Sequence, residues 1–171
     1  MTTSVNSKIN SAPTFNDRQK NTLRYIAERS PLIKYASSDH TVNTTTTLAN
    51  DAELYFDVQK DKRYIVEVCL FTTADATDGI KVAFATATDA TAARIYWRYL
   101  IDNAANQTET QTDLTSPAPT GVAAAITEIV ANGYIQAAAD GRITLQSALV
   151  ADNNAATTIL KGSYLKVYEV E

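Results

Sequence analysis

The side chains best suited to nucleophilic or acid–base catalysis are scarce in this chain, which contains one histidine, His40, and one cysteine, Cys69. A Ser-His-Asp triad would need His40 beside a serine, yet no serine lies in a pattern that resembles a nucleophile elbow. His40 follows Asp39 where a strand is expected to start, so a surface or turn role fits it better. Cys69 lies among strand residues and is expected to be a small buried side chain. We therefore predict that the protein is not an enzyme.

Metal and cofactor chemistry has equally little support. Zinc would require several Cys or His ligands, which this composition cannot provide. Calcium needs only oxygen ligands, and the turns that contain Asp75, Asp78 and Asp152 could supply them, although Asp is also an ordinary turn residue. The five glycines are isolated, so no glycine-rich loop is available for phosphate. We predict no cofactor and no resident metal, and ion ligation by these three aspartates is the open alternative.

Paired carboxylates could hydrolyse a glycosidic bond, and the sequence offers two candidate pairs. They are Asp51 with Glu53 and Glu67 with Glu128. The first pair falls in an expected turn, and nothing in the sequence brings the second pair together. Solvated positions on a sheet face explain both pairs more simply.

A cluster of aromatic residues, IYWRYL at 95–100, allows two interpretations. An exposed Trp97 beside polar groups could form a platform for a sugar ring. Alternation along a strand instead places Tyr96 and Arg98 on one face and Trp97 and Tyr99 on the other. Because large aromatic side chains more often pack than stack on ligands, we predict that Trp97 belongs to the core or to a subunit contact.

These residues need a scaffold, and several segments of the sequence alternate between apolar and polar side chains, as half-buried antiparallel strands do. Strands are expected at about 41–48, 53–59, 63–73, 79–87, 92–101, 122–131, 133–138, 141–150 and 163–170. The side chains predicted to be buried are Leu54, Phe56, Val58, Val66, Val68, Leu70, Val82, Phe84 and Val167. Many short strands separated by turns predict an all-β fold, with an antiparallel β-sandwich or jelly-roll-like body.

Turn residues separate the expected strands. Residues 49–51 and the charged segment 59–62 are predicted turns, and Asn132-Gly133 predicts a type I′ hairpin. Asp140-Gly141 is a further turn signal. Residues 102–120 include two prolines and are predicted to form a long loop, and a loop of this length is usually either functional or mobile.

The N-terminal residues are expected to be a separate element, so we divide the chain into an arm at 1–35 and a β-sandwich domain at 36–171. Within the arm, residues 14–29 predict a short helix that stops at Ser30-Pro31. Its apolar stripe is too narrow to stabilise it alone, so we expect it to pack on the body, on a neighbouring copy or on another protein. The residues predicted to dock are Phe15, Arg18, Leu23, Arg24, Tyr25, Ile26 and Arg29.

Charge is distributed unevenly along the chain. Residues 1–40 carry six basic and three acidic side chains, a net charge of +3, whereas residues 41–171 carry nine and sixteen, a net charge of −7. Such an acidic body argues against nucleic-acid binding, which needs clustered Lys and Arg. No apolar run approaches the ~20 residues that cross a bilayer, and the N-terminus lacks the apolar core of a signal peptide. We expect neither nucleic acid nor membrane as a partner, and synthesis in the cytosol.

Residues 32–71 combine a threonine-rich segment, a turn, and two alternating strands joined by a charged turn. The pattern TL-x-x-D-x-x-L-x-F-x-V followed by Y-x-V-E-x-x-L-F occurs at Thr47, Leu48, Asp51, Leu54, Phe56, Val58, Tyr64, Val66, Glu67, Leu70 and Phe71. This part of the chain resembles a β-sandwich domain that recurs in structural proteins of tailed bacteriophages.

The resemblance implies a virion protein, most simply a capsid decoration (cement) protein that binds and stabilises the assembled shell. It implies the major capsid protein as a partner, a homo-oligomer with a trimer favoured, and a place on the capsid surface after synthesis in the host cytoplasm. The alternative is a tail or fibre component with a receptor-binding role. A third class, a small carbohydrate-binding or carbohydrate-active module, rests on Trp97 and the carboxylates.

Overall fold

The computed structural model describes residues 30–42, 45–74, 77–86, 90–101, 105–114, 120–122, 125–151 and 156–170. The chain divides into two units, residues 1–31 and residues 32–171. Of the first unit only Ser30 and Pro31 are described, so the helix predicted at 14–29 lies outside the described residues. The domain boundary after residue 35 stays a prediction, and residues 32–35 form a strand of the second unit.

Within the described residues the second unit consists of strands, turns and loops, which confirms the predicted all-β class. The strands are β1 (Leu32–Tyr35), β2 (His40–Val42), β3 (Ala49–Val58), β4 (Arg63–Thr73), β5 (Ile80–Thr86), β6 (Ala90–Ile101), β7 (Gln107–Gln111), β8 (Thr120–Val122), β9 (Ile126–Ala137), β10 (Gly141–Ala148), β11 (Thr157–Ile159) and β12 (Tyr164–Val170). Each pairing described between them is antiparallel.

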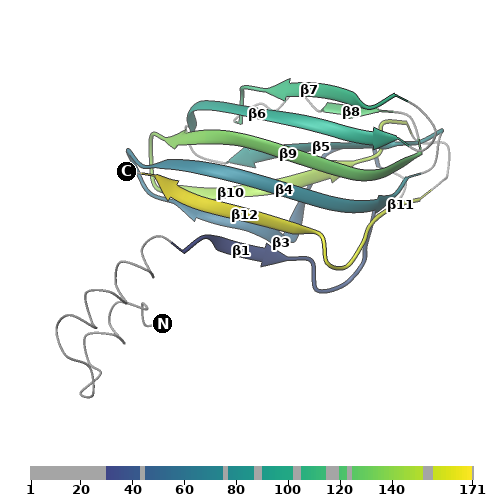
Figure 1. Ribbon diagram of the computed structural model, residues 1–171, viewed down its shortest axis with the longest axis horizontal. Coiled ribbons are helices and arrows are strands. Elements are labelled where there is room, and N and C mark those ends of the chain that lie inside the picture. The colour runs from purple at the N-terminus through teal and green to yellow at the C-terminus, as the bar shows by residue number, and fades with distance from the viewer. Residues whose placement is uncertain are drawn as a thin grey trace, which may run out of the picture. The chain divides into compact units, whose positions relative to one another are not determined.

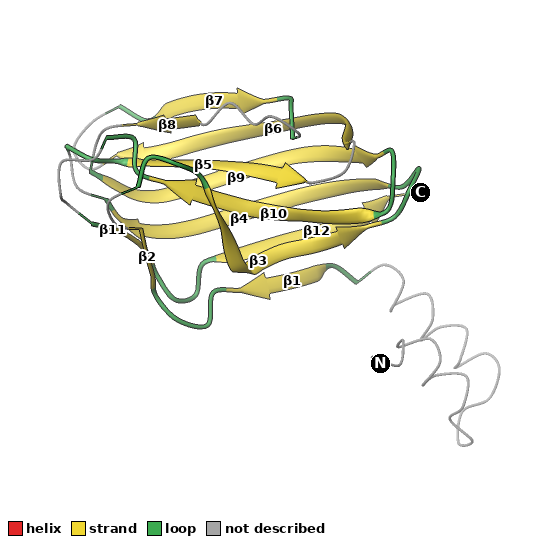
Figure 2. Ribbon diagram, turned by 180° about the vertical axis from the view of Figure 1, so that it is seen from behind, coloured by secondary structure: helices red, strands yellow, loops and turns green. Residues whose placement is uncertain are grey.

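The strands form two sheets that pack face to face, which confirms the predicted sandwich. The large sheet has eight strands in the order β1-β12-β4-β9-β6-β7, with β11 paired to β4 and β2 paired to β11. The small sheet has four strands in the order β3-β10-β5-β8. Figure 1 shows the second unit from the side of the large sheet. Figure 2 shows it from behind, with the small sheet nearer the viewer.

The facing sides of the two sheets form a single apolar core. All nine side chains predicted to be buried are buried, and Leu54, Phe56 and Val58 share the inner side of β3 as their alternation indicates. Aromatic rings link the sheets across this core. The ring centroid of Phe84 lies 6.2 Å from that of Phe56 and 5.6 Å from that of Trp97, which belongs to the large sheet.

The hairpin predicted at Asn132-Gly133 is wrong, because β9 runs without a break through both residues. Gly133 lies opposite Ile95 of β6 in the register. A Cβ at residue 133 would clash with the backbone oxygen of Arg94 and would lie 2.7 Å from Cα of Ile95. The glycine therefore permits two strands to approach closely, and it is not there to form a turn.

The boundary predicted between the strands at 41–48 and 53–59 is also wrong. β2 ends at Val42, and residues 49–51, predicted as a turn, are the first residues of β3. The turn chemistry is present within the strand, because Oδ1 of Asp51 accepts hydrogen bonds from the backbone N–H groups of Glu53 and Leu54, both at 2.8 Å. The register with β10 shifts at this point, so Asp51 stabilises a bulge and not a chain reversal.

Part of the loop predicted at 102–120 is the strand β7. Its sequence, QTETQ, has no apolar alternation that would reveal a strand. Gln111 at its end is buried, and its side-chain amide accepts a hydrogen bond from the Phe84 N–H at 2.9 Å and donates one to the Phe84 carbonyl at 2.7 Å. The amide thus joins β7 of the large sheet to β5 of the small sheet, as a neighbouring strand would.

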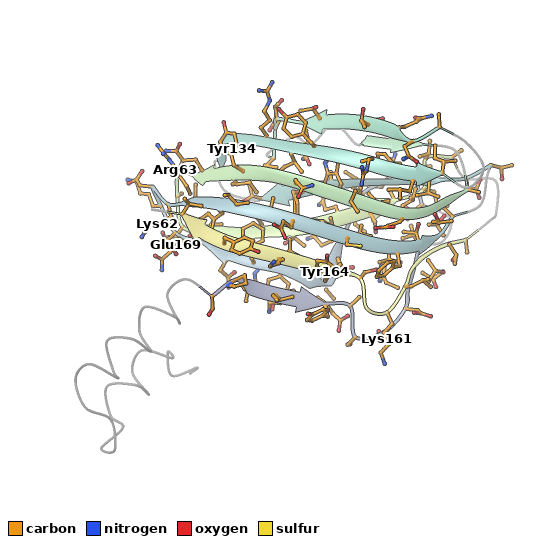
Figure 3. All side chains as sticks on the ribbon, in the orientation of Figure 1. Lys62, Arg63, Tyr134, Lys161, Tyr164 and Glu169 are labelled. Atoms are coloured by element: carbon orange, nitrogen blue, oxygen red, sulfur yellow. The ribbon has the colours of Figure 1, made fainter. Side chains whose placement is uncertain are left out.

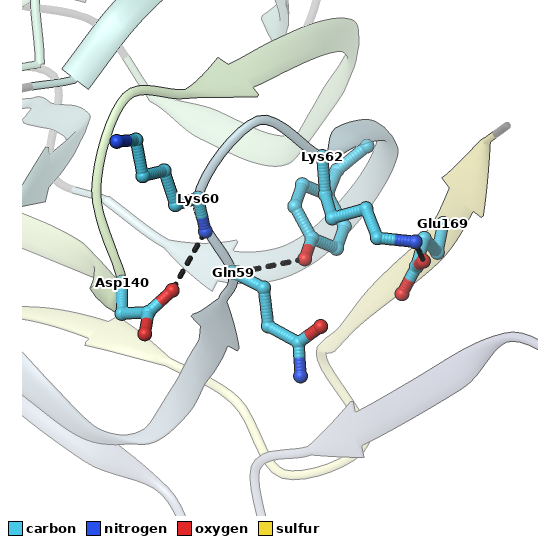
Figure 4. A network of polar contacts seen from close by, with 6 residues as sticks. Gln59, Lys60, Lys62, Asp140 and Glu169 are labelled. Atoms are coloured by element: carbon cyan, nitrogen blue, oxygen red, sulfur yellow. Dashed lines mark hydrogen bonds and ion pairs between the residues drawn. The ribbon is translucent and has the colours of Figure 1, made fainter.

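The predicted turn at 59–62 connects β3 to β4 and is held by three neighbours, as Figure 4 shows. The backbone N–H of Lys60 donates to Oδ1 of Asp140 at 2.7 Å, and that of Gln59 donates to the Tyr64 hydroxyl at 2.9 Å. The Lys62 ammonium lies 2.7 Å from Oε1 of Glu169. These contacts tie the crossing between the sheets to the turn after β9 and to the end of β12.

Candidate functional site

The two side chains best suited to catalysis, His40 and Cys69, have different surroundings. His40 is exposed on β2, where its backbone partner is Ile159 of β11. Cys69 is buried in β4, and its thiol donates a hydrogen bond to Oε1 of Glu128 at 3.3 Å. Burial, followed by the hydrogen bond and the negative charge of Glu128, raises the pKa of the Cys69 thiol to about 11. The thiol is therefore protonated at neutral pH and is a poor nucleophile.

Both carboxylates of the first candidate pair, Asp51 and Glu53, accept hydrogen bonds from neighbouring residues. Asp51 binds the bulge of β3, as described above. Glu53 accepts hydrogen bonds from the hydroxyl of Ser37 and from its backbone N–H, the latter at 2.7 Å. These two bonds lower the pKa of the Glu53 carboxyl, so the group that a glycosidase would need as an acid is held in its ionised form.

The second pair, Glu67 and Glu128, lies on neighbouring strands but not at opposite positions. Glu67 pairs with Asn132 in the register, whereas Glu128 pairs with Phe71, four residues further along β4. At about 3.3 Å per residue the two backbone positions are roughly 13 Å apart. The Glu67 carboxylate lies 3.4 Å from the Lys166 ammonium, and the Glu128 carboxylate accepts the hydrogen bond from Cys69. The carboxylates of both pairs are therefore engaged with neighbouring groups of the fold.

Of the three aspartates considered as ion ligands, Asp78 alone is described. It is buried, and its backbone carbonyl accepts hydrogen bonds from the N–H groups of Val150 at 3.0 Å and Ala151 at 3.2 Å. Asp75 and Asp152 lie outside the described residues, so the prediction that these turns hold no ion is untested. In the described part of the chain, no group of three or more His, Cys, Asp or Glu side chains could hold a metal ion.

The exposed apolar side chains gather on the outer face of the large sheet. Alternate residues of β1, β12, β4, β9 and β6 point to this side, away from the core. We name it the tyrosine-rich face and define it by Ile33, Tyr35, Ile65, Phe71, Tyr96, Tyr134, Tyr164 and Tyr168. Six of these eight are large apolar side chains that are exposed, and Tyr35 is 58%, Tyr96 52% and Tyr134 46% exposed.

The strand register makes the tyrosine-rich face continuous. Tyr168 lies opposite Ile65, and Ile65 lies opposite Tyr134 on the next strand. At the β1 edge Tyr35 lies opposite Tyr164, with ring centroids 6.2 Å apart. Figure 3 shows Tyr134 and Tyr164 on the side of the sheet that faces the viewer. Side chains at opposite positions are close enough to touch, so these groups form one surface and not isolated exposed residues.

Charged groups are interleaved with the tyrosines. The face carries four basic and two acidic side chains, namely Arg63, Arg94, Arg98, Lys166, Glu67 and Glu128. Lys166 lies 3.4 Å from Oε2 of Glu67, and the Arg94 guanidinium lies 5.7 Å from the centre of the Tyr96 ring. The net charge of +2 contrasts with that of residues 32–171, which carry ten basic and seventeen acidic side chains.

A shallow, open depression of about 540 Å³ lies on this face above β6, β7 and β9. Its lining includes Tyr96, Arg98, Thr108, Thr110, Val130 and Asn132. Trp97 is fully buried on the opposite side of β6, which confirms its predicted place in the core. An exposed tryptophan platform for sugar is therefore wrong, and the exposed aromatic ring of this segment is Tyr96.

The outer face of the small sheet has a different character. The Arg142 guanidinium lies 2.8 Å from Oδ1 of Asp57 and 4.0 Å from the centre of the Tyr55 ring. Nearby, the side-chain amide of Gln146 donates to that of Asn50 at 2.8 Å. None of the exposed large apolar side chains of the described residues lies on this face. Its polar groups bind one another.

The residues predicted to dock lie outside the described residues, from Phe15 to Arg29. The full set is Phe15, Arg18, Leu23, Arg24, Tyr25, Ile26 and Arg29. Sequence reasoning missed the tyrosine-rich face, although one signal was available. Tyr or Phe recurs at outward positions of several strands, where a solvated sheet would carry polar side chains. As for membranes, the described part of the chain includes no helix long and apolar enough to span one.

No protein-family model matches this chain, and no curated protein is similar to it in sequence. Similar solved structures come from infectious bursal disease virus. They are the VP2 subviral particle (9% identity, TM-score 0.27), the Gx strain (8%, 0.20) and the Gt strain (13%, 0.21). The alignments cover 81%, 83% and 81% of this chain and 40%, 41% and 36% of the viral chains, so this chain spans about two fifths of their length. TM-scores this low do not establish a common fold.

Proposed function

We propose that this chain is a non-enzymatic structural protein of a bacteriophage virion, and specifically a capsid decoration protein that binds the assembled shell and stabilises it. The observation that carries the proposal is the tyrosine-rich face. A continuous exposed surface of Tyr, Phe, Ile and Arg has the composition of a protein interface, whereas a solvated sheet face is polar. The resemblance of residues 32–71 to phage structural proteins supports the virion as the setting.

The mechanism is linkage between binding and assembly. A protein that binds the closed shell, and not its separated subunits, stabilises the shell by the free energy of that binding. The contribution repeats at each equivalent site on the capsid surface. Binding and packing therefore account for the function, without chemistry at His40, Cys69 or the carboxylate pairs.

The proposed partners are the major capsid protein and further copies of this chain. Docking to the shell is assigned to the arm, whose net charge of +3 over residues 1–40 is opposite to that of the body. Because the arm's predicted helix has a narrow apolar stripe, a partner surface has to supply apolar contacts and acidic groups for Arg18, Arg24 or Arg29. The proposed location is the capsid surface, with neither nucleic acid nor membrane as a partner.

The experiment is quantitative binding of the full chain to particles that lack it. We expect saturation at hundreds of copies per particle and release of the packaged genome at a higher temperature. The control is a chain that lacks residues 2–30, which retains every strand described here and is expected to remain folded without binding. Saturation at a few copies, or no binding, would contradict the decoration role.

The runner-up is a tail or fibre component that binds a receptor, and the depression beside Tyr96 favours it. That depression places an exposed aromatic ring near the side chains of Arg98, Asn132 and Thr110, which suits a sugar ligand. A glycan array distinguishes the two roles. Binding that is lost in Tyr96→Ala and retained in Tyr55→Ala, on the other outer face, would favour the receptor-binding role over decoration.

A further inference from the structure

We propose that the tyrosine-rich face is the contact between copies of this chain, so that the outer faces of the large sheets pack against one another. The inference deepens the homo-oligomer included in the proposed function, and it rests on that part of it alone. The virion setting is not needed for the argument, because each step uses the described residues of the second unit.

The area of the face matches that of an oligomer interface. Six of its side chains are between 39% and 58% exposed, namely Ile33, Tyr35, Ile65, Phe71, Tyr96 and Tyr134. With 150–250 Å² for each fully buried large side chain, they expose roughly 400–700 Å² of mostly apolar surface. A standard interface buries about 800 Å² on each partner, and the half-buried Tyr164 and Tyr168 add to the total. The face is therefore close in size to one side of a standard interface.

The chemistry of the face favours a protein over a glycan or a nucleic acid. Ile65 lies between Tyr168 and Tyr134 and offers no hydrogen bond to a sugar hydroxyl, and neither does Phe71 further along β4. Sugars and phosphates need polar groups at such positions, whereas the buried centre of a protein interface is apolar, with Tyr and Arg enriched. Ile65 is central, because Tyr168 and Tyr134 lie on either side of it.

The charged groups of the face allow reciprocal ion pairs with a second copy. No described carboxylate forms an ion pair with Arg63 or Arg98. Glu67 on β4 and Glu128 on β9 carry carboxylates on the same face. A second copy turned over this face brings its carboxylates toward the first copy's guanidiniums, and the reverse contact forms by symmetry.

The test is sedimentation velocity of the full chain over a wide range of concentration. The variants are Ile65→Lys, Tyr134→Lys and both together. These side chains are opposite each other and 44% and 46% exposed, so lysine is tolerated by the isolated fold. Thr144→Lys adds the same charge to β10, the second strand of the small sheet, and is the matched control. Circular dichroism and thermal unfolding of the dissociated protein verify that each variant folds.

We expect the wild type and Thr144→Lys to form the same oligomer. The double variant should be a folded monomer, with a dissociation constant at least about 100-fold higher, because two central side chains are lost and charge is buried. A wild type that is monomeric at every concentration, or a double variant that assembles as the wild type does, would overturn the inference.

The same variants separate this inference from the proposed function. A double variant that is monomeric but still binds particles supports the contact between copies and leaves decoration intact. Failure of the wild-type oligomer to bind particles would contradict decoration alone. A monomeric wild type whose particle binding is lost in the double variant would overturn the contact between copies and assign the face to the shell.

Discussion

The outer faces of the two sheets differ although the inner faces are alike. Inside, both sheets carry alternate large apolar side chains that pack into one core. Outside, the small sheet binds its own polar groups, as Arg142 does with Asp57 and the Tyr55 ring. The large sheet instead leaves Tyr96, Tyr134 and others roughly half exposed.

The difference shows on which outer face the exposed side chains contribute little to the stability of the isolated domain. Exposed tyrosine and isoleucine side chains gain little for an isolated domain, and a continuous apolar patch lowers its solubility. A self-contained polar face has no such cost. The tyrosine-rich face is therefore the better candidate for contact with another molecule, and the small sheet is expected to face solvent.

The largest effect is expected in the core that both faces share. Phe56→Ala should lower the free energy of unfolding by about 3–5 kcal/mol, because a fully buried ring would leave a cavity. Tyr55→Ala, the next residue on the outer side of the same strand, should cost much less. Urea unfolding followed by circular dichroism measures both. A greater loss for Tyr55→Ala would mean that the inner and outer faces of β3 have been exchanged.

A smaller loss is expected where the two sheets are joined through a side chain. Gln111→Leu should lower the free energy of unfolding by about 2–4 kcal/mol, because it leaves the Phe84 N–H and carbonyl without the amide partners they have now. Gln107→Leu, at the exposed end of the same strand, is the control and should change stability little. Equal unfolding midpoints for the two variants would show that the amide does not join the sheets.

On the large sheet, Cys69 should report on the environment beneath the tyrosine-rich face. The rate of alkylation of the native thiol should rise with pH, with its midpoint at the raised pKa of about 11, whereas the ordinary pKa of a cysteine thiol is 9.0. The pKa of the Cys69 thiol is higher in the folded state than in the unfolded state. The contribution of the protonated thiol to the free energy of unfolding is therefore complete below the unfolded-state pKa, and it is lost as pH rises to the folded-state pKa. Glu128→Gln removes the neighbouring charge and should lower the native midpoint. Rapid alkylation of the folded wild type near pH 8 would contradict the described surroundings.

The smallest effect is expected on the outer face of the small sheet. Arg142→Ala removes an exposed ion pair with Asp57, and exposed pairs contribute little to stability. The urea midpoint and the sedimentation coefficient should both remain those of the wild type. A second substitution with little expected effect is His40→Ala, at an exposed position of β2, which should leave particle binding unchanged. If Arg142→Ala dissociated an oligomer, the contrast between the two faces would be reversed.

Alternation was sufficient to predict the core, because a strand with one buried side has a period of two that the sequence records directly. Phe56 and Val66 are examples. Turn signals in the local sequence led to wrong predictions where a strand distant in sequence determines the conformation. Gly133 looks like a turn residue until Arg94 and Ile95 are seen to leave no room for a Cβ.

The candidate surface was harder to predict than the core. Its members come from strands distant in sequence, and only the register places Tyr168, Ile65 and Tyr134 side by side. β7 was missed for a related reason, since its polar residues are stabilised by pairing with β6 and by the buried amide of Gln111. The predicted docking residues, Phe15 to Arg29, lie outside the described residues and stay predictions.

Cryo-electron microscopy of particles saturated with the full chain tests both the decoration role and the contact between copies. We expect hundreds of copies on the capsid surface, with the tyrosine-rich faces of neighbouring copies in contact and the outer face of the small sheet exposed to solvent. Copies confined to the tail would contradict the decoration role. A tyrosine-rich face open to solvent, with the outer face that carries Asp57 and Arg142 buried, would contradict the assignment of the tyrosine-rich face as the contact surface.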